Sequence, residues 1–299
     1  MLLQRLTRSS RLPTPLFRCV STQTPGPSEP LRRPNTNTAS FGFQTVKEDE
    51  KESLVKNVFD SVASSYDLMN DASSLGVHRL WKDSFVSGLK PGKHGPMRCI
   101  DVAGGTGDIA LRILDYAREK HYDRETTVDV ADINAQMLKE GERRFKQTMY
   151  HNTPQVSFNV ANAQSLPKER FADNSYDLYT IAFGIRNCTS IPSVLEEAYR
   201  VLKPGGTFAC LEFSRVNNPL LATIYDQYSF SVIPLMGTIL AGDRASYQYL
   251  VESIRRFPPQ PEFAQMIRDA GFSTGPDVDG GAWSDQWGGI ACVHKGVKL

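Results

Sequence analysis

The residues best suited to chemistry lie in a glycine-rich stretch, "DVAGGTGDIA", which begins at Asp101. Without a Cβ atom, Gly105 and Gly107 allow the backbone to turn sharply and to approach a ligand closely. The spacing of these glycines with Ala110 fits the dinucleotide fingerprint, in which the small residue lets the helix pack closely on the strand. Asp101 enters the stretch and Asp108 follows its last glycine, so two carboxylates flank a loop of a kind usually built for phosphate.

These carboxylates argue against a dinucleotide. Its pyrophosphate would lie at the helix N-terminus, where free N–H groups and the helix dipole favour an anion, and Asp101 and Asp108 would repel it. S-adenosylmethionine carries an ammonium and a sulfonium and no phosphate, so it suits the loop better. Asp132, in "VADIN", follows the next strand and is placed to accept hydrogen bonds from ribose hydroxyls. The simpler interpretation makes Asp108 an ordinary helix N-terminal acid and Asp101 a strand-end cap, but it does not explain the set together.

The chain around the loop alternates between short apolar stretches and helical ones. This alternation is typical of parallel strands joined by crossover helices, and it predicts an α/β fold with a Rossmann-like, mostly parallel sheet and helices on both faces. The predicted strands are "RCIDVA", "TTVDVAD", "QVSFNVANA", "SYDLYTIAF", "GTFACLEFS" and the closing "GGIACVHKGV". The predicted helices of this core are "GDIALRILDYAREK", "INAQMLKEGERRFKQTMY", "IPSVLEEAYRVL" and "PEFAQMIRDAGF".

Two segments lie outside this alternation. Residues 47–90 are helical in pattern and precede the first strand, and residues 216–260 interrupt the sheet after strand five. Ligands of open α/β sheets bind at the carboxyl ends of the strands, so a helical insertion after strand five can fold over that edge as a lid. Its aromatic and aliphatic content suits an apolar substrate. The alternative is an extra helical pair that completes the core.

The first 40 residues differ from the rest in charge. They hold six arginines against the single acid Glu29, with serine, threonine and leucine between them. We therefore expect a mitochondrial transit peptide followed by a linker without fixed structure over residues 1–40, rather than only a disordered basic tail. Residues 41–299 would then form the folded domain.

Composition limits the remaining function classes. The 299 residues are 40% hydrophobic and 22% charged, as in a soluble globular protein. The body of the chain is mildly acidic and shows no basic stripe, which argues against nucleic acid. The five cysteines form no C-x-x-C pair and have no histidine at ligand spacing, so we expect free thiols and no metal site. The apolar stretch 230–242 is too short to span a bilayer, though it could rest on one.

Several separate stretches of the chain resemble the ubiquinone and menaquinone biosynthesis C-methyltransferases, over residues 42–299. The glycine loop and "LKPGG" are common to many methyltransferases, whereas "YDLMN" with the following H-x-x-W, "FGIRN" and "YLVESIRRFP" are more specific. The resemblance implies a class I S-adenosylmethionine-dependent methyltransferase fold and methylation of a ring carbon of a polyprenylated quinol. By the same motifs, Thr106 and the pair Asn162 and Ala163 in "NVANAQ" would contact S-adenosylmethionine, the pair beside its adenine.

The resemblance and the transit segment together indicate the mitochondrial ubiquinone branch. The substrate would be a 2-polyprenyl-6-methoxy-1,4-benzoquinol. The resemblance also implies peripheral attachment to the matrix side of the inner membrane, in a complex with other ubiquinone-biosynthesis proteins, and it leaves a homodimer open. The chain departs from the bacterial pattern near its end, where "DVDGGAWSDQWGGIACVHKG" replaces a short "NLTGGIVAIH" type of ending.

A neutral ring carbon is a poor nucleophile, so the enzyme needs a device that ionises the adjacent hydroxyl. "FGIRN" follows strand four, at the edge where chemistry is expected, and supplies Arg186 and Asn187. A guanidinium keeps its proton, so Arg186 is expected to stabilise a phenolate or hold a water rather than act directly as a base. Tyr66 and Asn70 of "YDLMN" would complete the pocket. His78 is the conventional choice of base, although it also suits a packed helix position.

Three other functions deserve comparison with this one. A nicotinamide dehydrogenase would share the glycine loop but not its acidic flanks. A methyltransferase acting on oxygen or on a protein side chain would share the loop but lack "YDLMN" and "ESIRRFP". A scaffold protein without catalysis would not need Asp101, Asp132 and Arg186 intact.

Overall fold

The computed structural model describes residues 38–62, 70–71, 74–241, 243–275 and 282–299. The predicted transit peptide and the predicted site residue Tyr66 lie outside these ranges.

The described residues form a seven-stranded sheet in the order β5-β4-β3-β6-β7-β9-β8. The first five of these strands run parallel, and β9 runs antiparallel to both β7 and β8. The predicted mostly parallel sheet is thereby confirmed. The strands are β3 (Arg98–Val102), β4 (Thr127–Asp132), β5 (Val156–Val160), β6 (Tyr176–Ala182), β7 (Leu202–Phe213), β8 (Trp283–Gln286) and β9 (Ala291–Val297).

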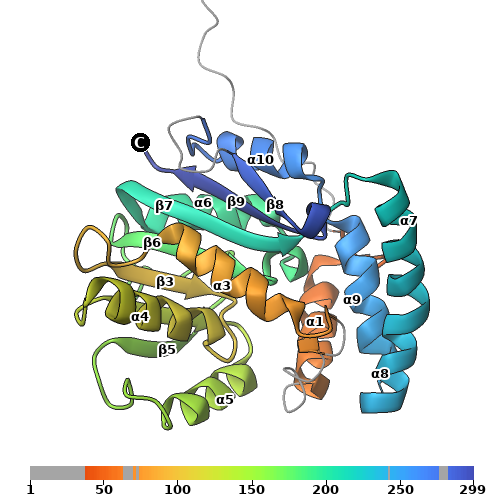
Figure 1. The fold of residues 1–299 in the computed structure, drawn as a ribbon, viewed down its shortest axis with the longest axis horizontal. Helices are drawn as coiled ribbons and strands as arrows, with labels where there is room; N and C mark the ends of the chain where they lie inside the picture. Colours follow the sequence, from red (N-terminus) through yellow and green to blue (C-terminus); the bar gives the residue numbers. More distant parts are fainter. Residues whose placement is uncertain (1–37, 63–69, 72–73, 242, 276–281) are drawn as a thin grey trace, which may run out of the picture. The chain divides into compact units, whose positions relative to one another are not determined.

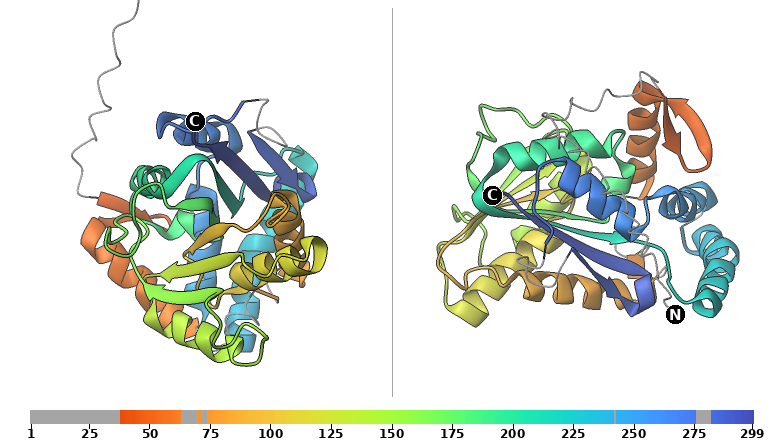
Figure 2. Two further views of the ribbon diagram at one scale, coloured as in Figure 1. Left: turned by 90° about the vertical axis from the view of Figure 1, so that its left-hand side faces the viewer. Right: turned by 90° about the horizontal axis from the view of Figure 1, so that it is seen from above.

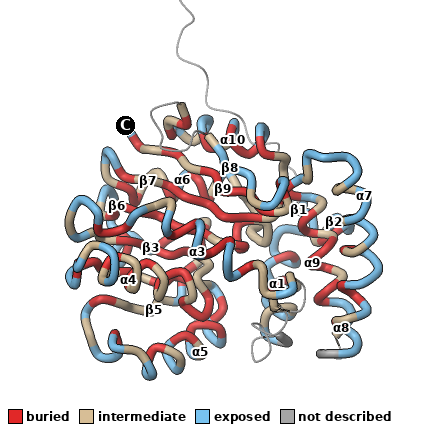
Figure 3. Tube along the Cα trace, viewed as in Figure 1, coloured by how far each residue is buried: buried red, intermediate tan, exposed pale blue. Residues whose placement is uncertain are grey.

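Helices cover both faces of the sheet, as predicted (Figure 1). One face carries α3 (Val77–Leu89), α4 (Asp108–His121) and α5 (Ala135–Phe145), whose apolar residues share a core cluster. The other face carries α6 (Ile191–Val201) and α10 (Gln260–Asp269) with a second cluster. The central strands are therefore buried on both sides, which explains why they read as nearly continuous apolar runs (Figure 3).

The segment before the sheet begins with a hairpin that the sequence did not predict. It consists of β1 (Thr38–Phe41) and β2 (Gln44–Lys47) and leads into α1 (Glu48–Val62), so β1 includes residues 38–40 of the stretch expected to be linker. The Phe41 ring stacks on that of Tyr249 with centroids 4.4 Å apart. The Phe43 N–H donates to Glu252 at 3.0 Å. The hairpin is thus attached to a helix about 200 residues further along the chain.

The insertion after β7 is helical, as predicted. It contains α7 (Pro219–Gln227), the π-helical turn η3 (Tyr228–Val232), α8 (Ile233–Ala241) and α9 (Arg244–Arg256). These helices have an apolar cluster of their own, centred on Ile233, Tyr247 and Val251. They lie beyond the end toward which β7 runs (Figures 1 and 2). This is the position expected of a lid, and it disfavours a helical pair that completes the core. None of the helices in the described ranges has the length and apolar character needed to cross a membrane.

Candidate functional site

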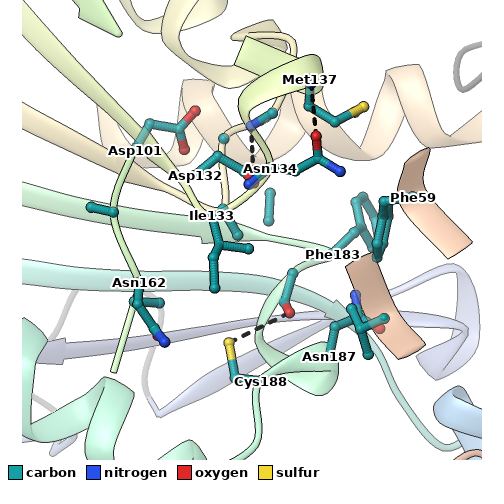
Figure 4. A pocket seen from close by; sticks show the side chains of 18 of the residues that line it. Phe59, Asp101, Asp132, Ile133, Asn134, Met137, Asn162, Phe183, Asn187 and Cys188 are labelled. Carbon is teal, nitrogen blue, oxygen red and sulfur yellow. Dashed lines mark hydrogen bonds between the residues drawn. The ribbon is translucent and has the colours of Figure 1, made fainter. Parts of the chain in front are cut away.

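A pocket lies at the carboxyl ends of β3, β4, β5 and β6 (Figure 4). The predicted cofactor residues that line it are Asp101, Gly105, Thr106, Asp132, Asn162 and Ala163. Asn187, predicted to be catalytic, lines it as well. In Figure 4, Asp101 and Asn162 lie on one side of this pocket and Phe59 and Asn187 on the other. Residues up to 86 positions apart in the sequence therefore share one site because parallel strands end at one edge.

The glycine loop turns as its composition requires. Gly105 and Gly107 have φ values of 50° and 75°, in the left-handed region that favours glycine. Gly107 precedes α4 but does not line the pocket. A Cβ atom on it would lie 2.8 Å from the Phe145 ring, so its role is in the turn and in packing. Gly107 therefore shapes the turn of the loop, and its contact with the cofactor stays a prediction.

Asp132 ends β4 and has both carboxylate oxygens in hydrogen bonds. One oxygen accepts from the Gly105 N–H at 2.9 Å and the other from the Asn134 N–H at 2.8 Å. Burial raises the pKa of Asp132 to about 6. Each carboxylate oxygen has a second lone pair, so Asp132 can still accept hydrogen bonds from two hydroxyls of a ligand. A ribose offers such a pair.

Asp101 is more deeply buried, with a relative exposure of 1%. One oxygen accepts from the Thr180 hydroxyl at 2.8 Å, because β3 and β6 pair these two residues side by side. The other oxygen is buried without a hydrogen-bond partner among the described residues. Burial raises the pKa of Asp101 to about 7, and the neighbouring carboxylates Asp108 and Asp132 add to the increase. An unpartnered acceptor that lines a pocket fits a cationic donor, such as the ammonium of S-adenosylmethionine.

Asp108 also lines the first pocket, but unlike Asp101 it is paired with cations of the protein itself. Its carboxylate contacts Lys82 Nζ at 2.8 Å and Arg112 Nε at 3.5 Å. Burial alone would raise the pKa of Asp108, but these two cations outweigh it and hold the pKa below its usual value. The charge of Asp108 is therefore balanced within the protein. The case against a pyrophosphate rests on Asp101 and Asp132 instead.

Helix α1 closes the pocket and was not predicted to contribute to it. Glu52, Val55, Lys56 and Phe59 line the pocket, at the spacing of one helix face. Asp60 of the same helix accepts a hydrogen bond from the Asn134 amide at 2.9 Å. The spacing of these residues predicts a helix with one buried face. It does not predict that this face lines the ligand pocket.

A second pocket adjoins the first and shares Phe59, Lys82, Phe183 and Asn187 with it. Three predicted catalytic residues, Asn70, Arg186 and Asn187, line this pocket together. The remaining lining residues are Val58, Ser74, His78, Phe213, Ser246, Tyr249 and Leu250. The structure thus brings most of the predicted catalytic set to one place, beside the predicted cofactor set but in a separate compartment.

Arg186 is held by a buried ion pair. Its Nη1 donates to Glu212 at 2.7 Å and to the Phe183 carbonyl at 2.6 Å. The guanidinium also lies over the Phe213 ring, 5.3 Å from its centroid. Burial raises the pKa of Glu212, while Arg186 acts in the opposite direction. The contact with Glu212 could not be predicted from the sequence, because the two residues come from the ends of different strands.

Tyr249 of α9 fixes the orientation of Asn187. The Tyr249 hydroxyl donates to the Asn187 side-chain oxygen at 3.0 Å. Because the Asn187 side-chain oxygen accepts this hydrogen bond, its NH₂ group remains available to donate to a ligand. Since Asn187 lines both pockets, this donor lies where the two compartments meet. Tyr249 belongs to the "YLVESIRRFP" stretch that carries the family resemblance, but no role was assigned to it.

The chain matches the ubiE/COQ5 methyltransferase family over residues 44–298. It is 58% identical to the Schizosaccharomyces pombe mitochondrial 2-methoxy-6-polyprenyl-1,4-benzoquinol methylase, over 89% of this chain and 87% of the relative. It is 50% identical to the Brucella canis ubiquinone/menaquinone biosynthesis C-methyltransferase UbiE, over 87% and 91%.

Among solved structures, an S-adenosylmethionine-dependent methyltransferase from Thermotoga maritima, titled a possible histamine N-methyltransferase, aligns with a TM-score of 0.53. At 18% identity, over 82% of this chain and 100% of that one, this likeness shows the fold alone. The fold is that of the class I methyltransferases, as the sequence predicted. By the family match and the identity to these relatives, the chain belongs to the ubiE/COQ5 methyltransferase family.

Proposed function

We propose that this protein transfers a methyl group from S-adenosylmethionine to a ring carbon of 2-methoxy-6-polyprenyl-1,4-benzoquinol, in mitochondrial ubiquinone biosynthesis. The observation that carries the proposal is the pair of adjoining pockets. One contains the Asp101 oxygen that has no hydrogen-bond partner among the described residues, and the other contains Arg186; the two share Asn187 and Phe183. The name of the similar yeast protein supports this acceptor, and that of the similar bacterial protein supports methylation of a carbon in quinone biosynthesis.

In the first pocket, the residues fit the parts of S-adenosylmethionine, which supplies a methyl group bound to a positively charged sulfur. Asp132 would accept from its ribose hydroxyls and Asp101 from its ammonium. Asn162 and Ala163, which follow β5, would lie beside the adenine, and Thr106 would contact the ligand from the glycine loop. Gly105 allows the loop to come close because it has no side chain there.

In the second pocket, the task is to hold the quinol with its ring carbon toward the methyl group, at near-attack distance. Arg186 stabilises negative charge on the quinol oxygen as the hydroxyl ionises. The Asn187 amide, oriented by Tyr249, donates to the same region. Asn70 lines this pocket. Tyr66, which belongs to the same "YDLMN" motif, is proposed to contribute to the acceptor site by the family resemblance alone.

The polyprenyl tail calls for a route to a membrane. Helices α7 and α8 expose large apolar side chains. Helix α8 packs on α9, and α9 contributes residues to the wall of the second pocket. By the family resemblance, the protein would be a peripheral protein on the matrix side of the inner membrane. Residues 1–40 would be a transit peptide and linker, by their composition, and residues 41–299 the catalytic domain. Association with other ubiquinone-biosynthesis proteins and a homodimer belong to the same proposal.

Calorimetric titration followed by an activity assay tests the proposed function. Residues 41–299 are titrated with S-adenosylmethionine and separately with NAD, and then assayed for methyl transfer to a short-chain methoxybenzoquinol. We expect binding of S-adenosylmethionine alone and a methylated ring carbon. Binding of NAD would contradict the assignment of the first pocket. Binding of S-adenosylmethionine without turnover would point to another acceptor or to a scaffold.

The role of Arg186 needs a separate test. Arg186→Ala removes the cation expected to stabilise the phenolate, so kcat should fall at least about a hundredfold, in the range of losses seen when one such donor is removed. The Kd for S-adenosylmethionine should stay within about twofold. Because the substitution leaves Glu212 buried without its partner, Arg186→Lys is measured beside it. Full turnover in Arg186→Ala would remove this residue from the mechanism.

A further inference from the structure

His78 has the surroundings of a base rather than those of a packed helix residue. It lies on α3 with a relative exposure of 6% and lines the second pocket with Arg186 and Tyr249. Its Nε2 atom is 2.8 Å from Asp71 Oδ1. Its Nδ1 atom is buried and has no hydrogen-bond partner in the described part of the chain. A buried ring nitrogen without a partner costs free energy. Because this nitrogen belongs to a residue that lines a pocket, a ligand in the pocket is a candidate partner.

Asp71 determines which nitrogen of His78 carries the proton. Arg79 donates two hydrogen bonds to the Asp71 carboxylate, at 2.9 and 2.7 Å. These bonds and the contact with His78 hold the pKa of Asp71 well below its usual range, so Asp71 is ionised. An ionised carboxylate can only accept, so Nε2 of His78 must hold the proton. In the neutral ring, Nδ1 then carries the free lone pair.

The charges around His78 keep the ring neutral. Burial lowers its pKa, and Lys82, one helical turn further along α3, acts in the same direction. Asp71 and Asp108 act in the opposite direction but do not reverse the shift. The lone pair on Nδ1 is thus available at neutral pH.

We propose that Nδ1 of His78 is the base that accepts the hydroxyl proton of the quinol, and that Asp71 positions its ring for this task. The inference rests on the proposed function, since it concerns the acceptor pocket of that reaction. It assigns Arg186 and His78 complementary roles: the guanidinium stabilises the oxygen anion and the imidazole takes the proton.

Methyl transfer begins with deprotonation of the quinol. The quinol O–H proton moves to Nδ1, and the electron pair left on oxygen enriches the adjacent ring carbon. That carbon forms a bond to the methyl group as the methyl–sulfur bond breaks, and the bonding pair stays on sulfur. The ring carbon then loses its own hydrogen as a proton to solvent, and the ring becomes aromatic again. The proton on His78 returns to the oxygen, so one proton is released overall.

A second histidine provides a matched control. His294 on β9 is fully buried, its Nε2 lies 3.1 Å from the Gln260 carbonyl oxygen, and its Nδ1 is also without a partner among the described residues. It lines neither pocket. A substitution of His294 should lower stability, as a substitution of His78 would, because both remove a buried imidazole. It should not change the pocket that binds the methyl acceptor. His78→Ala and His294→Ala therefore separate chemistry from packing.

The first experiment uses 4-nitrophenol as a probe whose absorbance reports ionisation. Bound to the wild-type protein with S-adenosylhomocysteine, below the probe's own pKa, it should absorb as the phenolate. Bound to His78→Ala, it should absorb as the neutral phenol, and His294→Ala should behave as wild type. Asp71→Asn should give an intermediate phenolate fraction. A neutral probe on the wild-type protein, or a phenolate on His78→Ala, would overturn the proposal.

The second experiment measures turnover. His78→Ala should lower kcat by about 10²- to 10⁴-fold, the usual contribution of a positioned base, with the Kd for S-adenosylmethionine unchanged. Added imidazole should restore part of it, and the loss should shrink for quinols with more acidic hydroxyls. An equal loss across that series, without rescue, would assign His78 to packing. If the wild-type protein ionises the probe but methylates no benzoquinol, the base stands and the acceptor in the proposed function is wrong.

Discussion

Two aspartates of β4 show how one strand can serve two purposes at the scale of single residues. Asp132, at its end, meets the backbone N–H groups of Gly105 and Asn134 and lines the first pocket. Asp129 lies on the same strand but accepts hydrogen bonds from Tyr176 at 2.6 Å and Arg170 at 3.0 Å, away from either pocket. The difference follows from distance along the strand, since only the carboxyl end reaches the ligand edge.

Asp132→Asn should therefore weaken S-adenosylmethionine binding while Asp129→Asn should not. The lost hydrogen bonds between a charged acceptor and ribose hydroxyls are worth about 1.5–3 kcal/mol. The Kd should rise by about 10- to 150-fold in isothermal titration calorimetry. A similar increase for Asp129→Asn would mean that general damage to β4, rather than a lost contact, weakens binding.

Asp101 gives a prediction about pH. A carboxyl whose pKa rises from 3.8 to about 7 on folding binds its proton more tightly in the folded state. The contribution of Asp101 to the free energy of unfolding of the ligand-free protein is therefore largest below pH 3.8. It is lost as the pH rises from 3.8 through 7. The loss amounts to about 4 kcal/mol at most.

Thermal unfolding between pH 5 and pH 8 measures this contribution. We expect Asp101→Asn to raise the Tm of the ligand-free protein more at pH 8 than at pH 5. S-adenosylmethionine, whose cation favours the charged carboxylate, should raise the wild-type Tm more at pH 8 than at pH 5. A pH-independent effect of Asp101→Asn would show that Asp101 is already ionised at pH 5.

Asp101 and Asp132 could be predicted from sequence because each ends a strand, and strand ends of a parallel sheet meet at one edge. The pairing of Asp108 with Lys82 could not, since the two residues are 26 positions apart and belong to helices whose packing the local pattern does not fix. The same holds for Arg186 and Glu212. Local sequence determines which residues reach the edge, whereas the packing of distant elements determines which charges remain free there.

At the scale of elements, α9 links the insertion to the chemistry. It supplies Tyr249, whose hydroxyl orients Asn187 and whose ring stacks on Phe41 of the hairpin. The hairpin, the insertion and the turn after β6 therefore meet around one tyrosine. The insertion therefore fixes the orientation of a side chain at the boundary between the two pockets.

Tyr249→Phe tests this link. The ring and its stacking on Phe41 remain, but the Asn187 amide loses the donor that orients it. We expect kcat to fall about 5- to 13-fold, for one hydrogen bond worth about 1–1.5 kcal/mol, with little change in Tm or in the Kd for S-adenosylmethionine. Phe41→Ala is the complementary variant, since it removes the stacking and retains the hydroxyl. Unchanged kcat in Tyr249→Phe would mean that Asn187 needs no such orientation.

The alternation of strands and helices was predictable because strands buried on both faces are apolar throughout. Strands β1, β2 and β8 were missed because each has four residues, and their exposed or intermediate positions break the apolar pattern. They are held by neighbours instead: β8 pairs with β9, and the hairpin is attached to α9. The lid was predicted from its position after strand five, but its π-helical turn has no comparable signal in the sequence.

At the scale of the whole folded domain, apolar side chains gather on the outside of the insertion. Leu220, Ile224, Leu235 and Ile239 on α7 and α8 have relative exposures of 72%, 59%, 58% and 71%. Figure 3 shows the outer sides of α7 and α8 as mainly exposed. These helices belong to the same insertion as Tyr249, so a substrate leaving a bilayer at this surface would have a short path to the second pocket.

Replacing these four residues with serine should separate membrane access from catalysis. Each exposed leucine or isoleucine contributes on the order of 1 kcal/mol or more when it enters an apolar phase, so binding to cardiolipin-containing vesicles in flotation assays should fall at least tenfold. Turnover of a long-chain quinol in vesicles should fall with it, whereas turnover of a short-chain quinol in solution should not.

Tyr122 and Met149 provide the matched control. They are similarly exposed, at 85% and 63%, but follow the C-terminal ends of α4 and α5, at the opposite edge of the sheet. If serine at those two positions reduced vesicle binding as much, the insertion would not be the membrane face; if the four-residue variant lost short-chain turnover too, the same side chains would be needed for the pocket itself.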